Sequence, residues 1–178
     1  MKKFFVFIWE IVKIVAISLA IIIPIRYYLV QPFFVRGASM EPNFDNGQYL
    51  VIDELSYQLR EPKRGEVIVF KFPKDPSQYY IKRIIGLPKE TVEIKNNQVI
   101  IYNQEFKEGE VLDESVYSVN GQHIWGNVKM NLGEDEYFVL GDNRGASSDS
   151  RQWGSLPQKY IIGRVWLRAW PFDKAEVF

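Results

Sequence analysis

The N-terminal segment is the most apolar part of the chain. Residues 4–35 read FFVFIWEIVKIVAISLAIIIPIRYYLVQPFFV, with an uninterrupted apolar core from Ile14 to Ile25. Trp9 and the pair Tyr27–Tyr28 lie 18 residues apart, about 27 Å along an α-helix, which matches the aromatic residues that border a hydrocarbon slab. The pattern predicts one membrane-spanning helix within residues 1–30.

An uncleaved anchor and a cleaved secretory signal are the two interpretations of this segment. The small residues of a cleavage site would be Ser18 and Ala20, but they lie inside the apolar run, whereas a cleavage site follows the run. We therefore expect an anchor. Lys2, Lys3 and Lys13 slightly outnumber the arginines on the far side, which favours a cytoplasmic N-terminus.

Beyond the anchor, short apolar or alternating runs separated by turn residues replace the long apolar run. This pattern is typical of strands. Asn96-Asn97 indicates a hairpin turn and residues 143–154 indicate a long polar loop. We predict a mainly β domain over residues 31–178, an antiparallel, barrel-like or folded sheet, with the polar stretch 103–135 as a surface insertion. The seven expected strands are residues 49–52, 66–70, 79–86, 91–94, 98–102, 136–141 and 161–170.

Composition narrows the chemistry that this domain can perform. The chain has 178 residues, enough for one domain with a short appendage, and its zero net charge gives no support for nucleic-acid binding. Cysteine is absent, which excludes thiol catalysis, disulfides and thiolate metal sites. His123 is the single histidine, which excludes a His-based metal cluster, and we expect neither a metal nor a cofactor.

The stretch RGASMEPNF, residues 36–44, places Ser39 between small residues and a Met-x-Pro turn. A serine hydroxyl is a poor nucleophile until a neighbouring base removes its proton. Lys82 lies inside the apolar run YYIKRIIG, where burial would lower its pKa below the usual value of about 10.4 and let the neutral amine act as a general base. Taken singly, a serine such as Ser39 is more often a turn hydroxyl than a nucleophile, and a lysine such as Lys82 is more often a solvent-facing strand residue than a base.

Taken together, four segments in this order resemble the bacterial type I signal peptidases, or leader peptidases, of family S26. They are SMEP at 39–42, RGEVIVF at 64–70, YIKRIIGLP at 80–88 and GDNRGASSDSRQWG at 141–154. The small size and single anchor are most similar to the Gram-positive form of these membrane-bound Ser/Lys proteases. The resemblance implies that Ser39 is the nucleophile, that Lys82 is its general base and that the catalytic domain is extracytoplasmic.

The resemblance also implies supporting roles within the last segment. Ser147 matches a serine that hydrogen-bonds to the lysine and orients it. Asp149 and Arg151 match an ion pair that holds the site together, and Asp142 and Arg144 match similar supporting residues. Without the resemblance, these charges would be interpreted as a solvated loop.

The substrate is expected, by the same resemblance, to lie as an extended strand between two stretches of backbone. Shallow apolar pockets there would select small side chains, typically alanine, one and three residues before the cut. Gly37 stands where some relatives have a hydroxyl donor for the oxyanion, and Pro88-Lys89-Glu90 stands where the family usually has Pro-Gly-Asp, so that turn loses its glycine. The residues expected to bind substrate are Phe34, Val35, Gly37, Ala38, Tyr79, Tyr80 and Ile81.

The expected function is removal of signal peptides from exported preproteins by a monomeric, single-pass enzyme of the bacterial plasma membrane, with preproteins and the lipid bilayer as partners. Three alternatives remain. An inactive membrane-anchored relative would act in assembly or binding, a self-cleaving repressor-type protease would carry a DNA-binding portion in place of the anchor, and a conventional triad would use His123. The presence of Ser39 and Lys82 disfavours the inactive relative, and the anchor disfavours the repressor-type protease. The polar, turn-rich surroundings of His123 disfavour the triad.

Overall fold

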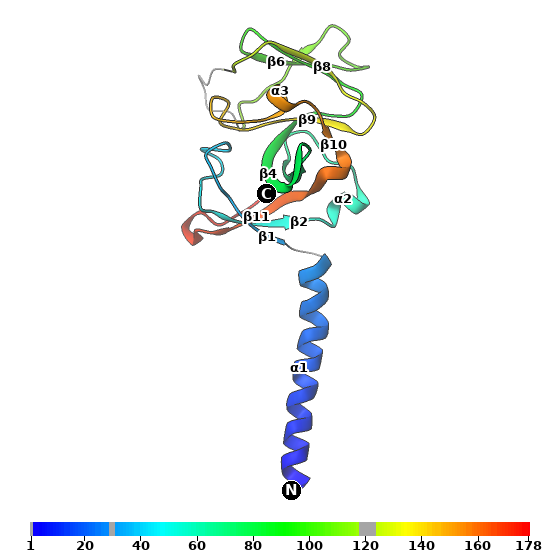
Figure 1. Ribbon diagram of the computed structural model, residues 1–178, viewed down its shortest axis with the longest axis vertical. Helices are drawn as coiled ribbons and strands as arrows, with labels where there is room; N and C mark the ends of the chain where they lie inside the picture. Colours follow the sequence, from blue (N-terminus) through cyan, green and yellow to red (C-terminus); the bar gives the residue numbers. More distant parts are fainter. Residues whose placement is uncertain (1, 29–30, 118–123) are drawn as a thin grey trace.

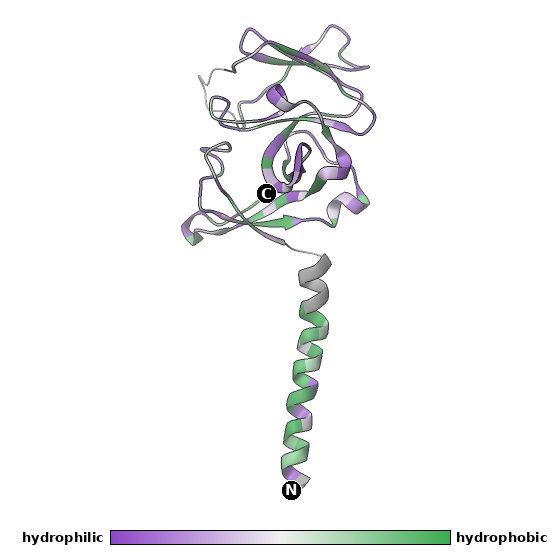
Figure 2. Ribbon diagram, in the orientation of Figure 1, coloured by the Kyte–Doolittle hydropathy of each residue, from purple (hydrophilic) through white to green (hydrophobic). Residues whose placement is uncertain are grey.

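The computed structural model describes residues 2–28, 31–117 and 124–178, which form one long helix followed by a β domain (Figure 1). Helix α1, Lys2–Tyr28, extends away from the domain. Its segment Lys3–Ile22 is long and apolar enough to cross a membrane, and none of it is buried against the domain (Figure 2). A helix that is mostly apolar and packs on nothing is typical of a membrane span.

The larger of two antiparallel sheets has the strand order β1-β2-β11-β3-β4-β9-β10, with β12 paired to β11. Its path ends at β1 and β10, so over the described residues it is an open, folded sheet. Both faces of β3 are buried, which accounts for the continuous apolar run VIVF. The bounds are β1 Gln31–Phe34, β2 Tyr49–Asp53, β3 Val67–Phe72, β4 Asp75–Gly86, β9 Glu136–Leu140, β10 Leu156–Pro157, β11 Ile161–Trp170 and β12 Glu176–Val177.

The smaller sheet has the order β7-β6-β5-β8 and lies at the end of the domain away from α1 (Figure 1). Its strands are β5 Thr91–Lys95, β6 Gln98–Tyr102, β7 Glu110–Val111 and β8 Val128–Asn131. The alternate residues of β5 and β6 are buried and pack against Ile85, Phe138 and Leu140 of the larger sheet. One shared core therefore joins the two sheets.

The seven predicted strands are all present, with bounds shifted by a few residues. Asn96 and Asn97 both adopt positive φ values, 51° and 65°, as a two-residue hairpin turn requires. Lys89 also has a positive φ, 67°, so the turn before β5 keeps a left-handed conformation although it lacks a glycine. Strand β1 was not predicted, because Pro32 breaks the pattern, and proline is tolerated there in an edge strand.

The prediction that 103–135 is only a surface insertion was wrong. Its strands β7 and β8 complete the smaller sheet, and Ile124 and Leu132 are buried in the shared core. Within the predicted polar loop 143–154, Ser150–Trp153 forms a short helix, α3. His123 lies outside the described residues. The remaining short helical segments are α2 Ser56–Leu59, η1 Gln158–Tyr160 and η2 Phe172–Lys174.

Candidate active site

Ser39 and Lys82 are brought into direct contact from segments 43 residues apart in the sequence. Ser39 lies in the loop that follows β1, and Lys82 lies within β4. The Lys82 Nζ donates a hydrogen bond of 2.8 Å to Ser39 Oγ and another of 2.8 Å to the Ile81 carbonyl. Neutral lysine has a lone pair that can instead accept the serine proton, so this geometry permits proton transfer between the two groups.

Lys82 is only 4% exposed. Burial lowers its pKa to about 8, because the ammonium form loses its hydration, while the charges of Asp149 and Asp142 act in the opposite direction. The Tyr80 ring centroid lies 5.5 Å from Nζ. A substantial neutral fraction of this lysine is therefore present in mildly alkaline solution.

The loop that carries Ser39 is fixed from both sides. The Val35 N–H donates to the Gln48 carbonyl, and the Gly37 N–H donates to Asn46 Oδ1, both at 2.9 Å. Gly37 has a φ of 91°, a conformation that suits glycine. Across the site, Asn143 donates from its backbone N–H to the Ser39 carbonyl, at 3.1 Å.

A groove of about 620 Å³ opens beside Ser39 and Lys82. The part of β4 before Arg83 pairs with β3 but not with β9, so within the described residues one backbone edge of Tyr79–Lys82 has no neighbouring strand. An extended peptide can add to such an edge. The seven residues expected to bind substrate all line this groove: Phe34, Val35, Gly37, Ala38, Tyr79, Tyr80 and Ile81.

Asp149 and Arg151 form the expected ion pair. Arg151 Nε donates to Asp149 Oδ1 and Arg151 Nη2 to Oδ2, both at 2.8 Å. Asp149 is fully buried, and it also accepts from the Gly141 N–H at 3.1 Å and caps the N-terminus of α3. These contacts engage both carboxylate oxygens of Asp149, which fits a structural role better than a catalytic one.

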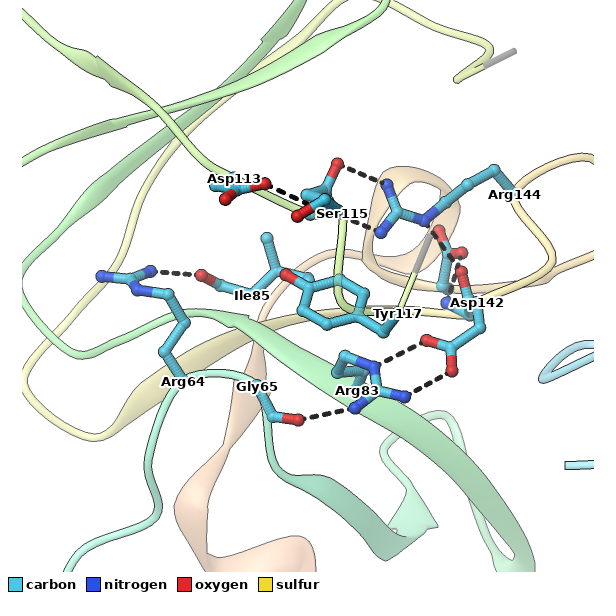
Figure 3. Close-up of polar contacts among 12 residues, drawn as sticks. Arg64, Gly65, Arg83, Ile85, Asp113, Ser115, Tyr117, Asp142 and Arg144 are labelled. Atoms are coloured by element: carbon cyan, nitrogen blue, oxygen red, sulfur yellow. Dashed lines mark hydrogen bonds and ion pairs between the residues drawn. The ribbon is translucent and has the colours of Figure 1, made fainter. Parts of the chain in front are cut away.

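Asp142 and Arg144 do not pair with each other, although both are buried as supporting residues should be. Asp142 accepts two hydrogen bonds from Arg83, at 2.8 and 2.6 Å (Figure 3). Arg144 instead donates two hydrogen bonds to the Glu114 carboxylate, at 2.5 and 3.0 Å. The sequence spacing could not reveal these partners, because each pair joins segments at least 30 residues apart. The one feature of the sequence that points to Arg83 is its position directly after Lys82.

Ser147 does not make the predicted hydrogen bond to Lys82. Its side chain is 94% buried, and its Oγ has no hydrogen-bond partner among the described residues. The hydroxyl packs against Gly141, where a Cβ atom would lie only 2.2 Å from it and 2.4 Å from the Ser39 carbonyl. Gly141 therefore allows the two loops to approach closely, and Ser147 keeps a free hydroxyl beside the loop that carries Ser39.

Comparison with known proteins places the chain in a family. Residues 8–170 match the family model described as signal peptidase, peptidase S26. A probable signal peptidase I-2 of Synechocystis is 35% identical over 93% of this chain and 74% of the relative, and the signal peptidase IB of Staphylococcus aureus is 30% identical over 90% and 88%. A crystal structure of a signal peptidase I from Enterococcus faecalis has 30% identity and a TM-score of 0.49, covering 60% of this chain and 97% of that one.

The fold and the sequence together define a mainly β serine endopeptidase with an N-terminal apolar helix. The chain belongs to the signal peptidase family, peptidase S26, whose members remove signal peptides from preproteins.

Proposed function

We propose that the chain is a membrane-anchored endopeptidase in which Ser39 and Lys82 act as the catalytic dyad and which cuts preproteins after small residues. The observation that carries this proposal is the 2.8 Å contact between Lys82 Nζ and Ser39 Oγ at the wall of the groove. In water a lysine side chain stays protonated near neutral pH and cannot act as a base. Burial lowers the pKa of Lys82 to about 8.

In the first step, neutral Lys82 removes the proton from Ser39 Oγ as this oxygen attacks the scissile carbonyl carbon. The Ser39 N–H has no acceptor among the described residues, and it is therefore available to donate to the developing oxyanion. The C–N bond then breaks as the Lys82 ammonium returns its proton to the leaving amine. Water then attacks the acyl carbon as Lys82 takes its proton, and Lys82 returns this proton to Ser39 Oγ as the acyl C–O bond breaks.

The substrate adds as a strand between the backbone of residues 34–38 and the open edge of Tyr79–Ile81. The apolar side chains of the groove then face the residues before the cut, and small residues such as alanine fit beside them. Gly37 supplies no hydroxyl, so a second oxyanion donor comes from backbone or water.

Residues 1–30 form the cytoplasmic tip and anchor, and residues 31–178 form an extracytoplasmic domain that acts as a monomer. The apolar surface of α1 supports the anchor, and the lysines near the N-terminus support the orientation. Ser39 and its groove then lie on the side of the membrane to which preproteins are exported.

The test is cleavage of a preprotein with an Ala-x-Ala site by the purified full chain in liposomes, followed by mass spectrometry. Ser39→Ala and Lys82→Ala are compared with Lys71→Ala, a control lysine that is exposed on the neighbouring strand β3. We expect wild type and Lys71→Ala to cut after the second alanine and both dyad variants to be inactive. Equal cutting by all four proteins would contradict the dyad, and no cutting by wild type across several preproteins would favour the inactive-relative alternative.

A further inference from the structure

A short segment far from the sequence motifs touches all three segments of the candidate active site. It comprises residues 113–117, between β7 and β8, and we call it the clamp segment. Its conformation is fixed locally, because the Ser115 N–H donates to Asp113 Oδ1 at 2.9 Å and the Tyr117 N–H donates to the Glu114 carbonyl at 3.1 Å. Figure 3 shows the clamp segment facing Arg83 and Arg144.

The first contact of the clamp segment is with the loop 141–151. Glu114 accepts two hydrogen bonds from Arg144, whose side chain is only 1% exposed. Arg144 Nε also donates to the Gly141 carbonyl at 3.0 Å. Asn143 lies between these two residues, and its N–H donates to the Ser39 carbonyl. The contacts of Arg144 therefore also fix the backbone that contacts Ser39.

The second and third contacts are made by Tyr117. Its ring lies over the guanidinium of Arg83, 4.4 Å from centroid to Cζ, and Arg83 directly follows Lys82. Its carbonyl accepts a 2.7 Å hydrogen bond from the Asn43 side chain, in the loop after Ser39. The same Asn43 amide donates to Asp142 Oδ2 at 2.8 Å.

We propose that Glu114 and Tyr117 are positioning residues, which hold the three segments of the active site in one fixed arrangement. The inference rests on the proposed dyad, because what the arrangement fixes is the placement of Ser39 against Lys82. The loops are packed too closely to move independently, since they meet at Gly141 with no room for a Cβ atom. A displacement of about 1 Å is enough to cost up to about 100-fold in rate.

The test compares Glu114→Gln with Glu90→Gln, a matched control. Glu90 also accepts two hydrogen bonds from one arginine, Arg64, and its other side-chain partners are Leu87, just beyond the end of β4, and Asn103. We expect Glu114→Gln to lower kcat between about 10- and 100-fold with KM changed less than two-fold, after correction for the folded fraction. Glu90→Gln loses stability but keeps kcat. Equal effects on kcat in the two variants would overturn the inference.

A second pair of variants covers the case in which Glu114→Gln fails to fold. Tyr117→Phe keeps the ring over Arg83 and the backbone carbonyl, so it retains kcat, whereas Tyr117→Leu loses the ring and lowers kcat by about 10-fold or more. Full activity of Tyr117→Leu, or equal losses in both variants, would contradict a positioning role of the ring.

A boronic-acid peptide with an Ala-x-Ala sequence separates this inference from the proposed function. Ser39 Oγ forms a bond to boron while its proton passes to Lys82, and the matched carboxamide peptide forms no bond. If the boronate binds wild type no more tightly than the carboxamide, the proposed dyad fails. If it binds wild type and Glu114→Gln with the same advantage, only the positioning role fails. We expect the advantage in wild type and a loss of at least 10-fold of it in Glu114→Gln.

Discussion

Two neighbouring residues of β4 have opposite electrostatic environments. Lys82 is buried beside the groove with a hydroxyl and a carbonyl as partners, whereas Arg83, on the other face of the strand, is held by both carboxylate oxygens of Asp142. Both carboxylates that act on Lys82, Asp142 and Asp149, are already engaged by arginines. A lysine can therefore approach neutrality close to two aspartates, provided that each aspartate has its own cation.

The largest effect is expected when Lys82 is replaced by arginine, the residue type of its neighbour Arg83. Lys82→Arg keeps a long cationic side chain but cannot lose its proton near neutral pH, so the rate of preprotein cleavage should fall by about 10³-fold. The measurement is kcat in liposomes. Retention of more than a tenth of the wild-type rate would show that proton removal by residue 82 is not required.

The next largest effect is expected from removing Asp142, the carboxylate that holds Arg83. Asp142→Asn leaves a mostly buried guanidinium without its carboxylate, which should cost about 3–5 kcal/mol of unfolding free energy. Denaturant unfolding of the full chain in detergent measures this loss. Asp45→Asn, which removes an exposed pair with Lys174, serves as the control and should cost about 1 kcal/mol or less; equal losses would contradict the assigned importance of burial.

Removing the buried charge of Lys82 should raise stability while it abolishes activity. The pKa of Lys82 is about 8 in the folded chain and 10.5 without burial, so the unfolded chain binds more protons between these values and stability rises with pH across that window. Below pH 8 the native state bears the full penalty, on the order of 3 kcal/mol. Lys82→Met should recover most of it at pH 7 and flatten the slope between pH 8 and 10.5. An unchanged slope would exclude Lys82 as its source.

The pH profile of the wild-type rate gives the smallest of these effects. If neutral Lys82 is the base, the rate should fall with acidification below its pKa of about 8, which amounts to about 50-fold between pH 8 and pH 6. The measurement is kcat across pH 6–10 with the folded fraction monitored. A flat acid limb would indicate that another group accepts the proton.

The sequence predicts those parts of the molecule that depend on local pattern. The alternating runs of β5 and β6 and the Asn96-Asn97 turn are set by neighbouring residues, and they were found in the structure. The resemblance selected Ser39 and Lys82, which the fold then brings to 2.8 Å. Their catalytic roles stay predictions until the variants are measured.

Contacts between distant segments could not be predicted. Glu114 and Tyr117 lie in a polar stretch with no regular period, and their importance follows from Arg144 and Arg83, which approach them only in the folded chain. For the same reason Asp142 was placed in the right group but without its true partner. Ser147 shows a further limit, because a motif position does not determine whether a hydroxyl finds the expected hydrogen-bond partner.

The short distance in sequence between α1 and Ser39 has a consequence for how the reaction depends on concentration. Ser39 lies eleven positions after Tyr28, so if α1 anchors the chain in a membrane, as proposed, Ser39 stays within about 40 Å of the end of the helix. Enzyme and a membrane-bound preprotein then meet by diffusion in two dimensions, at an effective concentration set by lipid area. Diluting such liposomes with buffer should leave the rate per enzyme unchanged, whereas adding lipid to the same bilayers should lower it.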